Sequence, residues 1–292
     1  MGDEFVIHQH HARRLHWDLR LEHDGVLASW SVPRGIPRDP RRNHRAIHTP
    51  DHPLEFKSFS GEIPAGQYGA GRITIYDRGT YTARKWRDDE VVIELHGERV
   101  SGRYALFQTD GDDWMMHRMD PPEAGWTPMP ADVRPMRAAP AKRLPADDAA
   151  WAFELDWPGE RALTGVSGGR VELRSGSPAG SLRALAEALA PTECLLDGVV
   201  MGFTDSTQYL VFDLLWLDGV ATMDLPYAQR RELLLGLDVN GPYWQTPPHF
   251  TGGGRFAVDA AREQGLPGVV AKRLESPYTP GAGSRDWREI PA

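Results

Sequence analysis

The first 118 residues carry short runs in which apolar and polar side chains alternate. Such runs cover residues 72–76, 91–95 and 104–107, and Gly- or Asp-bearing turns separate them, including DRGT at Asp77 and TDGDD at Thr109. Alternation with a period of two predicts strands that have one apolar and one polar face. Many short strands joined by such turns are typical of an all-β sandwich or barrel.

The pattern changes in the second half of the chain. Apolar strands are expected at residues 194–201 and 209–217, and they alternate with stretches of helical periodicity. The expected helices cover residues 181–189, 226–237 with Asp224 as its cap, and 255–264 ended by Gly265. Leu233, Leu234 and Leu237 are expected to pack along the second of these helices. This half is therefore expected to be α+β.

A proline-rich stretch separates the two patterns. Seven prolines lie between Asp120 and Pro145, at positions 121, 122, 128, 130, 135, 140 and 145. Such a composition is typical of an extended linker. We therefore expect an α+β protein with a small β-barrel domain at residues 1–119, a linker at 120–145 and an α+β domain at 146–292.

Residues 8–22, HQHHARRLHWDLRLE, combine an apolar alternation with an unusual polar face. In a strand, Trp17, Leu19 and Leu21 share one face. The opposite face carries His16, Asp18, Arg20 and Glu22. A simple surface strand does not call for this set of side chains.

Composition limits the possible functions. The net charge of -8 and the pI near 5.8 argue against a protein that coats nucleic acid through bulk positive charge. Residues 10–57 nevertheless hold nine Lys/Arg against six Asp/Glu, a local charge of +3, and eight of the eleven histidines lie between positions 8 and 52. The single cysteine, Cys194, fits a reducing cytoplasm. No signal peptide or membrane-length apolar segment is evident.

The spacing H-x5-H-x-D-x-R suits a catalytic metal site. His16 and Asp18 point the same way from one strand, and His10 would join them across a bend, leaving positions open for water and substrate. Arg20, one step further, has a guanidinium suited to phosphate, so a phosphoester substrate is implied. The alternative is a solvated or mutually hydrogen-bonded surface pair. The remaining nearby histidines, interpreted as surface or supporting residues, are His8, His11 and His23.

The runs FVIHQHHARRLHWDLRLEHDGVLASWSVPRGIP, PDHPLEF, FSGEIPAGQYGAGRITIYDRGTY, SGRYALF and WMMHRMD resemble the 3′-phosphoesterase module of bacterial multifunctional end-joining DNA ligases. The resemblance covers about residues 5–120. It implies a small β-barrel with a Mn²⁺-dependent site that removes a 3′-terminal ribonucleoside and then the 3′-phosphate. It assigns the metal ligands to His10, His16 and Asp18. It assigns phosphate binding to Arg20, His52, Arg14 and Arg34, with Arg20 and His52 as the catalytic pair.

Three positions depart from this pattern. Phe56 stands where the module usually has a tyrosine, so a hydroxyl contact to phosphate is lost. His44 stands where an arginine is expected, with Arg45 beside it as a possible substitute, and His8 replaces a usual glutamine. These changes bear on the second, phosphomonoesterase step more than on the first. The glycine-rich piece GQYGAGR at residues 66–72 is interpreted as a turn between strands.

The runs WAFELDWPGERAL, LLDGVVM, YLVFDLLWLDG, LPGVVAKRLESPY and SRDWREI are similar to the adenylyltransferase domain of ATP-dependent DNA ligases. The first motif of that family, E-x-K-x-D-G-x-R, is matched at Glu154, Gly159 and Arg161, but Asp156 stands at the lysine nucleophile. The resemblance also implies that acidic positions are replaced by Val199 and Pro267. Glu289 and Pro291 stand at the positions of the two lysines that the family's last motif usually contains. Lys272 is retained.

The sequence therefore predicts a cytoplasmic, nucleoid-associated DNA end-repair protein. It joins a phosphoesterase that uses Mn²⁺, or Co²⁺ or Zn²⁺, to a ligase-like pseudoenzyme that forms no covalent adenylate and lacks an OB domain. DNA 3′ ends, especially a primer–template with a terminal ribonucleotide or 3′-phosphate, are the expected substrate. End-joining proteins are possible partners, and no association with a membrane is expected. The alternatives are a non-catalytic DNA-end or repair-complex adaptor, and an active ATP-dependent ligase. The second half is either a docking surface or an inert folded remnant.

Overall fold

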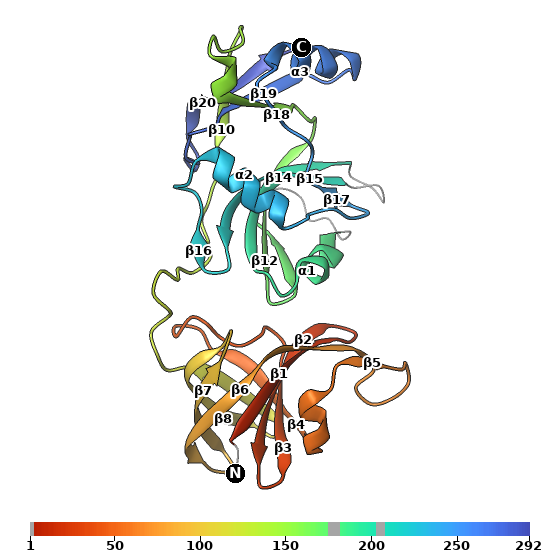
Figure 1. The fold of residues 1–292 in the computed structure, drawn as a ribbon, viewed down its shortest axis with the longest axis vertical. Coiled ribbons are helices and arrows are strands. Elements are labelled where there is room, and N and C mark those ends of the chain that lie inside the picture. The colour runs from red at the N-terminus through yellow and green to blue at the C-terminus, as the bar shows by residue number, and fades with distance from the viewer. Residues whose placement is uncertain (1–2, 175–181, 203–207) are drawn as a thin grey trace. The chain divides into compact units, whose positions relative to one another are not determined.

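The computed structural model describes residues 3–174, 182–202 and 208–292, and divides the chain into two compact units (Figure 1). The first unit is Met1–Trp126 and the second is Thr127–Ala292. The expected α+β fold, with a β-barrel first and an α+β unit second, is confirmed.

The proline-rich segment differs from its prediction. Residues from Thr127 onward belong to the second unit, so most of the expected linker is part of a fold. Met136 is fully buried there, and its backbone N–H donates to the hydroxyl of Tyr278 over 2.8 Å. Strand β10 (Arg137–Pro140) pairs in parallel with β20 (Gly283–Pro291). Proline suits this position because β10 lies at the edge of its sheet.

The first unit is a closed barrel. Its strands are β1 (Glu4–His11), β2 (Leu15–His23), β3 (Val26–Val32), β4 (His44–His52), β5 (Gly61–Ile63), β6 (Gly71–Trp86), β7 (Glu90–Gly97), β8 (Ser101–Asp110) and β9 (Asp113–Arg118). The order is β1-β2-β3-β4-β9-β8-β7-β6-β5, and an additional β1–β6 pairing closes the sheet on itself. A 3₁₀ helix, η1 (Leu54–Ser58), lies between β4 and β5.

Strand β2 shows why the barrel closes around a polar site. Its apolar face, with Trp17, Leu19 and Leu21, is buried as the alternation predicts. The opposite face is shielded as well, because Asp18 and Arg20 are only 6% and 4% exposed. Charged groups tolerate such burial only when they are paired or bind an ion. The polar face of β2 is therefore part of an enclosed centre.

The DRGT sequence at Asp77 is not a turn, and this prediction was wrong. Strand β6 runs through it without interruption, from Gly71 to Trp86. The carboxylate of Asp77 instead accepts hydrogen bonds from the backbone N–H groups of Glu98, Arg99 and Val100, at 3.1, 3.2 and 2.8 Å. Asp77 thus stabilises the neighbouring β7–β8 turn rather than forming one of its own. The TDGDD turn between β8 and β9 is confirmed.

The second unit contains two sheets and three α-helices among its described residues. One sheet has the order β10-β20-β19-β11-β18, and the other has the order β13-β12-β14-β15-β16, with β17 paired to β15. The remaining strands are β11 (Trp151–Leu155), β12 (Glu160–Ser167), β13 (Arg170–Leu173), β14 (Cys194–Met201), β15 (Gln208–Leu217), β16 (Val220–Ala221), β17 (Trp244–Gln245), β18 (Phe250–Thr251) and β19 (Gly268–Arg273). The helices are α1 (Arg183–Leu189), α2 (Tyr227–Gly236) and α3 (Gly254–Glu263), and a short η2 (Asp148–Ala150) precedes β11.

Helices α1 and α3 lie close to their predicted positions. The predicted start of α1, Ser181, falls outside the described residues. Helix α3 is preceded by Gly253, and the Asp148 carboxylate accepts from the N–H groups of Gly253 and Gly254 at 2.6 and 3.1 Å. Gly265 has a φ of 67°, as expected for a glycine that ends a helix. In the part of the chain that is described, no helix combines the length and apolar character needed to span a bilayer.

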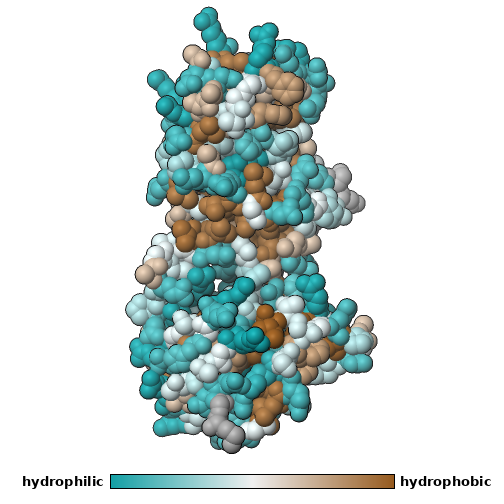
Figure 2. All heavy atoms as spheres, in the orientation of Figure 1, coloured by the Kyte–Doolittle hydropathy of each residue, from teal (hydrophilic) through white to brown (hydrophobic). Residues whose placement is uncertain are grey.

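Helix α2 packs in a different way from its prediction. Pro226, not Asp224, precedes the helix, and no side chain caps it. The helix buries Arg230 and Arg231 together with Leu234, whereas Leu233 and Leu235 are 37% and 52% exposed. Figure 2 shows brown hydrophobic side chains on the face of the second unit where Figure 1 shows α2. The expectation that Leu233 packs in the core was therefore wrong, because buried ion pairs hold this helix in place.

Replacement of Asp77 tests how the barrel is stabilised. We expect Asp77→Ala to lower the free energy of unfolding by about 2 kcal/mol, because three backbone donors lose a charged acceptor. The measurement is chemical denaturation of the full chain together with hydrogen exchange. The amides of residues 98–100 should lose protection selectively. Protection at these amides equal to that of the unmodified protein would contradict the role of Asp77.

Candidate functional site

The predicted metal ligands meet at one end of the β1–β2 hairpin. His10 on β1 and His16 on β2 are cross-strand partners, and Asp18 follows two residues later on β2. His10 Nδ1 lies 3.6 Å from Asp18 Oδ2, and His16 Nε2 lies 3.5 Å from Asp18 Oδ1. Two donors bound to one ion at about 2.1 Å each lie about 3.0 to 3.4 Å apart. The three side chains thus have nearly the spacing that a shared cation requires.

The protein fixes the orientation of His16. Its Nδ1 donates to the carbonyl oxygen of Arg14 over 2.9 Å. This hydrogen bond leaves the lone pair on Nε2, the nitrogen that faces Asp18. A backbone acceptor behind a histidine ligand is the usual means of setting its tautomer. The donor set of two imidazoles and one carboxylate suits Mn²⁺, Zn²⁺ and similar ions.

Arg20 is the buried hub of the site. Its Nε donates to His8 Nδ1 at 3.2 Å, and its Nη2 donates to Asp18 Oδ2 at 3.0 Å. Its Nη1 reaches both Ser29 Oγ and His52 Nδ1 at 2.9 Å. Four contacts to protein groups therefore hold the guanidinium beside the metal ligands.

The charges in the centre stabilise one another. Burial opposes ionisation of Asp18, but the hydrogen bond from His10 and the charges of Arg20 and His16 outweigh it and lower the pKa of Asp18. Burial and the Arg20 charge lower the pKa of His8 to about 4. Asp18 is therefore an ionised ligand at neutral pH, and His8 is a neutral acceptor for Arg20.

His52 comes from β4, on the other side of Arg20 from Asp18 in the hydrogen-bond network. Arg20 can only donate, so Nδ1 of His52 accepts, and the imidazole proton resides on Nε2. Burial and the Arg20 charge lower the pKa of His52. In the resting site His52 is consequently a neutral ring that offers one N–H.

Phe56 on η1 closes the side of the site at which a tyrosine was expected. The centre of its ring lies 5.4 Å from Arg20 Cζ and 5.2 Å from the His52 ring centroid. It also stacks on Phe59 at 4.7 Å. Phe56 thus shapes the pocket through aromatic and cation–π contacts, with no hydroxyl to offer a phosphate.

Two members of the site were given no specific contact by the sequence analysis. Of the two interpretations of His8, as a surface or as a supporting residue, the second is confirmed, because His8 is fully buried and contacts Arg20. Its position two residues before His10 on one strand face was the signal that could have found it. Ser29 is also fully buried, and its hydroxyl accepts from Arg20 and donates to the Leu27 carbonyl at 2.8 Å. A lone serine gives no comparable sequence signal.

The supporting basic residues lie further out. Arg14 and Arg34 are exposed, and neither side chain joins the hydrogen-bonded set around Arg20 among the described residues. Their phosphate-binding role stays a prediction.

His44, which stands where an arginine was expected, donates from Nδ1 to the Gly35 carbonyl at 2.7 Å. Arg45 pairs with Asp113. Because Arg45 is engaged with Asp113, its contacts give no support to its substitution for the expected arginine.

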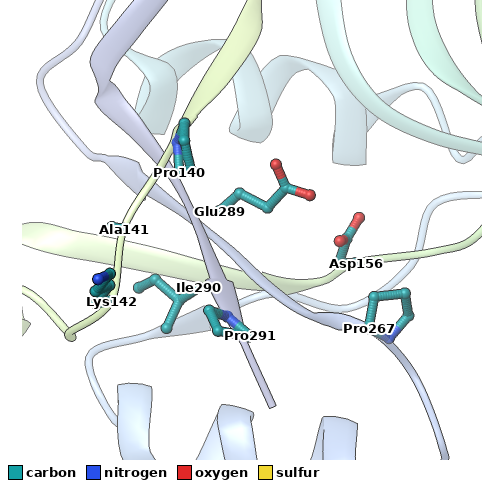
Figure 3. A pocket seen from close by; sticks show the side chains of 8 residues that line it. All are labelled: Pro140, Ala141, Lys142, Asp156, Pro267, Glu289, Ile290 and Pro291. Atoms are coloured by element: carbon teal, nitrogen blue, oxygen red, sulfur yellow. The ribbon is translucent and has the colours of Figure 1, made fainter.

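The ligase-like unit gathers its altered positions around one cavity of about 510 Å³ (Figure 3). Asp156, Pro267, Glu289 and Pro291 all line it. In Figure 3 the carboxylates of Asp156 and Glu289 lie on the same side of the cavity. Burial, and next the charge of Glu289, raise the pKa of Asp156. Four positions that the ligase resemblance interprets as altered thus line one cavity, together with Lys142.

The charged residues that match the ligase pattern form ion pairs with one another or with neighbouring residues. Lys272 Nζ lies 2.8 Å from Glu154 Oε2, and both are almost fully buried. Tyr227 donates to the same carboxylate, and the rings of Phe212 and Trp287 each lie 4.2 Å from Lys272 Nζ. Burial is the largest influence and lowers the pKa of Lys272, although Glu154 opposes it.

Arg161 is engaged in the same manner. It makes a two-pronged ion pair with Asp197, with both nitrogen–oxygen distances at 2.6 Å. Tyr278 donates to Asp197 as well, over 2.6 Å. Val199 is the cross-strand partner of Arg161. The predicted set therefore divides in two, with Asp156 and Pro267 at the cavity and Glu154 and Arg161 in ion pairs.

Comparisons with known proteins agree with both halves. The family model described as the DNA Ligase D 3'-phosphoesterase domain matches residues 8–108, and the ATP dependent DNA ligase domain matches residues 197–290. A LigD protein of Mycobacterium tuberculosis is 41% identical over 98% of this chain and 41% of its own length. A LigD protein of Pseudomonas aeruginosa is 29% identical over 98% of this chain and 43% of its own.

Among solved structures, a mycobacterial DNA ligase D complexed with ATP and MES is 34% identical, with a TM-score of 0.49, over 55% of this chain and 60% of that chain. The chain spans about two fifths of the length of the curated relatives named above. From the extent of the sequence identity, the chain belongs to the family of multifunctional non-homologous end joining proteins called LigD.

Proposed function

We propose that the first unit is a Mn²⁺-dependent phosphoesterase that trims DNA 3′ ends during end repair, in the cytoplasm at the nucleoid. The observation that carries the proposal is the convergence of His10, His16 and Asp18 beside a buried arginine. Its substrates are a 3′-terminal ribonucleoside and a 3′-phosphate. The family membership supports a role in end joining.

The chain's own residues supply most of the chemistry. His10, His16 and Asp18 would hold the ion, which on binding would polarise a phosphate oxygen and lower the pKa of a bound water. Arg20 provides a fixed positive charge that offsets charge on the phosphate as it develops. Because four protein contacts hold the guanidinium in place, little reorganisation accompanies the reaction.

His52 serves first as a donor to the phosphate. Its Nε2 carries the proton because Nδ1 accepts from Arg20. An anionic phosphate at Nε2 would raise the depressed pKa of His52, so the ring could take up a proton at Nδ1, giving up the hydrogen bond from Arg20, and pass the Nε2 proton to the leaving oxygen. His52 is thus the catalytic acid of the proposal, and Arg20 is its electrostatic partner.

The second unit, we infer, does not transfer adenylate. A carboxylate at Asp156 cannot form the phosphoramidate that a lysine nucleophile forms, and Glu289 beside it repels a triphosphate. Lys272 cannot replace the nucleophile because Glu154 and three aromatic rings enclose it. We propose that this unit docks end-joining proteins through its exposed apolar side chains, which include Leu233 and Leu235 on α2.

Removal of one ligand tests the phosphoesterase. With Mn²⁺ and a primer–template that ends in one 3′ ribonucleotide, the full chain should yield a 3′-phosphate and then a 3′-OH. We expect His16→Ala to lower the rate at least about 100-fold, because an open coordination position weakens the ion's hold. The matched control is His96→Ala, an exposed histidine of the same barrel, which should keep full activity. Bound but uncut DNA with Mn²⁺, Co²⁺ and Zn²⁺ would favour the adaptor.

The residue at position 56 tests the second step. We expect Phe56→Tyr to speed conversion of 3′-phosphate to 3′-OH about fivefold, because a hydroxyl beside Arg20 and His52 adds a hydrogen bond worth about 1 kcal/mol. Removal of the ribonucleoside should change by less than twofold. The measurement is single-turnover kinetics on two separate substrates, one for each step. An equal effect on both steps would show that position 56 does not discriminate between them.

Incubation with labelled ATP and Mg²⁺ tests the second unit. We expect no label on the protein after a denaturing gel, either in the unmodified chain or in Asp156→Lys. The single substitution should fail because Glu289, Pro267 and Pro291 still line the cavity. An active ATP-dependent ligase run alongside provides the positive control. A labelled band from the unmodified chain would refute the assignment as a pseudoenzyme.

A further inference from the structure

The loop between β5 and β6 presents an aromatic ring to solvent. Tyr68, in this loop, is 75% exposed, the highest value among the large hydrophobic side chains that the structure describes as exposed. Hydrogen bonds from Gln67 N to the Pro64 carbonyl and from Ala70 N to the Gln67 carbonyl, at 3.3 and 3.2 Å, shape the loop. Such exposure costs hydrophobic free energy, which burial against a partner would recover.

The strand register sets this loop beside the metal ligands. On β6, which begins where the loop ends, Ile73 is the partner of His10 and Arg72 is the partner of His11. A Cβ at Gly71 would collide with the His11 carbonyl oxygen and come within 2.9 Å of Ala12 Cα. Only glycine allows this approach, so the loop and the β1–β2 turn meet at the end of the hairpin that carries His10 and His16.

The same end of the barrel is basic. Arg13 and Arg14 are exposed on the β1–β2 turn, and Arg72 is exposed at the start of β6. The hairpin end that these arginines flank carries His10 and His16, and Asp18 of the same cluster pairs with Arg20 at 3.0 Å. An exposed ring among arginines, next to a phosphate site, is the combination that single-stranded nucleic acid binds.

We propose that Tyr68 is a stacking platform for a nucleobase that flanks the phosphate held at Arg20. This inference rests on the proposed function and adds to it a residue that holds the strand rather than reacting with it. Stacking uses the face of the base, which every nucleotide has, so the platform accepts ends of any sequence. Tyr68 is therefore a positioning residue, and its loss should weaken substrate binding more than turnover.

Kinetics on the full chain with Mn²⁺ test the platform. With the ribonucleotide-ended primer–template, we expect Tyr68→Ala to raise KM about tenfold and to change kcat by less than twofold, as loss of one stacked base predicts. Tyr68→Trp should keep the original KM. The matched control is Phe256→Ala, which removes a ring that is 65% exposed on α3 in the second unit and should leave KM unchanged.

Two modified substrates identify the base. An abasic site at the terminal or the penultimate position should raise the KM of the unmodified chain to that of Tyr68→Ala at one of the two positions, with no further effect in the variant. The fluorescence of 2-aminopurine at that position should be quenched by the unmodified chain and by Tyr68→Trp, but not by Tyr68→Ala. Equal KM and equal quenching in the unmodified chain and Tyr68→Ala would overturn the inference.

The quenching experiment does not depend on turnover, so it separates the two claims. Quenching that requires Tyr68, in a chain that cuts no 3′ end with any of the three ions, would refute the phosphoesterase activity and still support the stacking site. Cleavage that is insensitive to Tyr68→Ala, with equal quenching, would sink the stacking site and leave the phosphoesterase.

Discussion

The guanidinium of Arg20 determines which atoms its buried neighbours turn toward it. Arginine keeps its charge and can only donate, so each neighbour must present a lone pair. His8 and His52 therefore accept through Nδ1, and Asp18 is held in its ionised form. The second carboxylate oxygen of Asp18 is then left to face His16. Removing any one acceptor would leave one N–H of the buried guanidinium without its partner, which is costly in a shielded site.

Barrel closure is what makes this arrangement possible. The β1–β2 hairpin brings His10 opposite His16, and β3 and β4 add Ser29 and His52 from strands further along the sheet. Because β1 also pairs with β6, the site has no open sheet edge on that side. The centre is thus enclosed by contacts from four strands, β1 to β4.

The second unit uses buried ion pairs for a different purpose. Asp213 and Arg230 form a two-pronged pair at 2.7 and 2.9 Å, and both are fully buried. Glu154 and Lys272 form a buried pair at 2.8 Å, and Asp197 forms a two-pronged pair with Arg161, whose side chain is 29% exposed. Charges that match the ligase pattern are thereby satisfied within the fold. Lys272 and Arg161 are thus engaged in ion pairs and do not line the cavity that holds Asp156 and Glu289.

The sequence predicted the features that depend on local periodicity and spacing. An all-β sandwich or barrel and several of the strands followed from alternation, and the His10–His16–Asp18 cluster followed from the H-x5-H-x-D pattern, while the barrel itself was implied by the family resemblance. The partners of Arg20 were harder, because Ser29 and His8 join it only through strand pairing. Asp77 was misread because a turn-like sequence can sit inside a strand when its carboxylate serves another turn. The packing of α2 was misread because its buried face includes Arg230 and Arg231 beside Tyr227 and Leu234.

The most direct test of the central claim is a Mn²⁺ titration of the full chain, followed by electron paramagnetic resonance of the free ion. The account predicts that one equivalent of Mn²⁺ is taken up with the signal of the free ion suppressed, and that His10→Ala or Asp18→Asn abolishes this uptake while His96→Ala preserves it. Uptake that is unchanged by loss of His10 or Asp18, or no uptake at all, would contradict the assignment of this site as a metal centre.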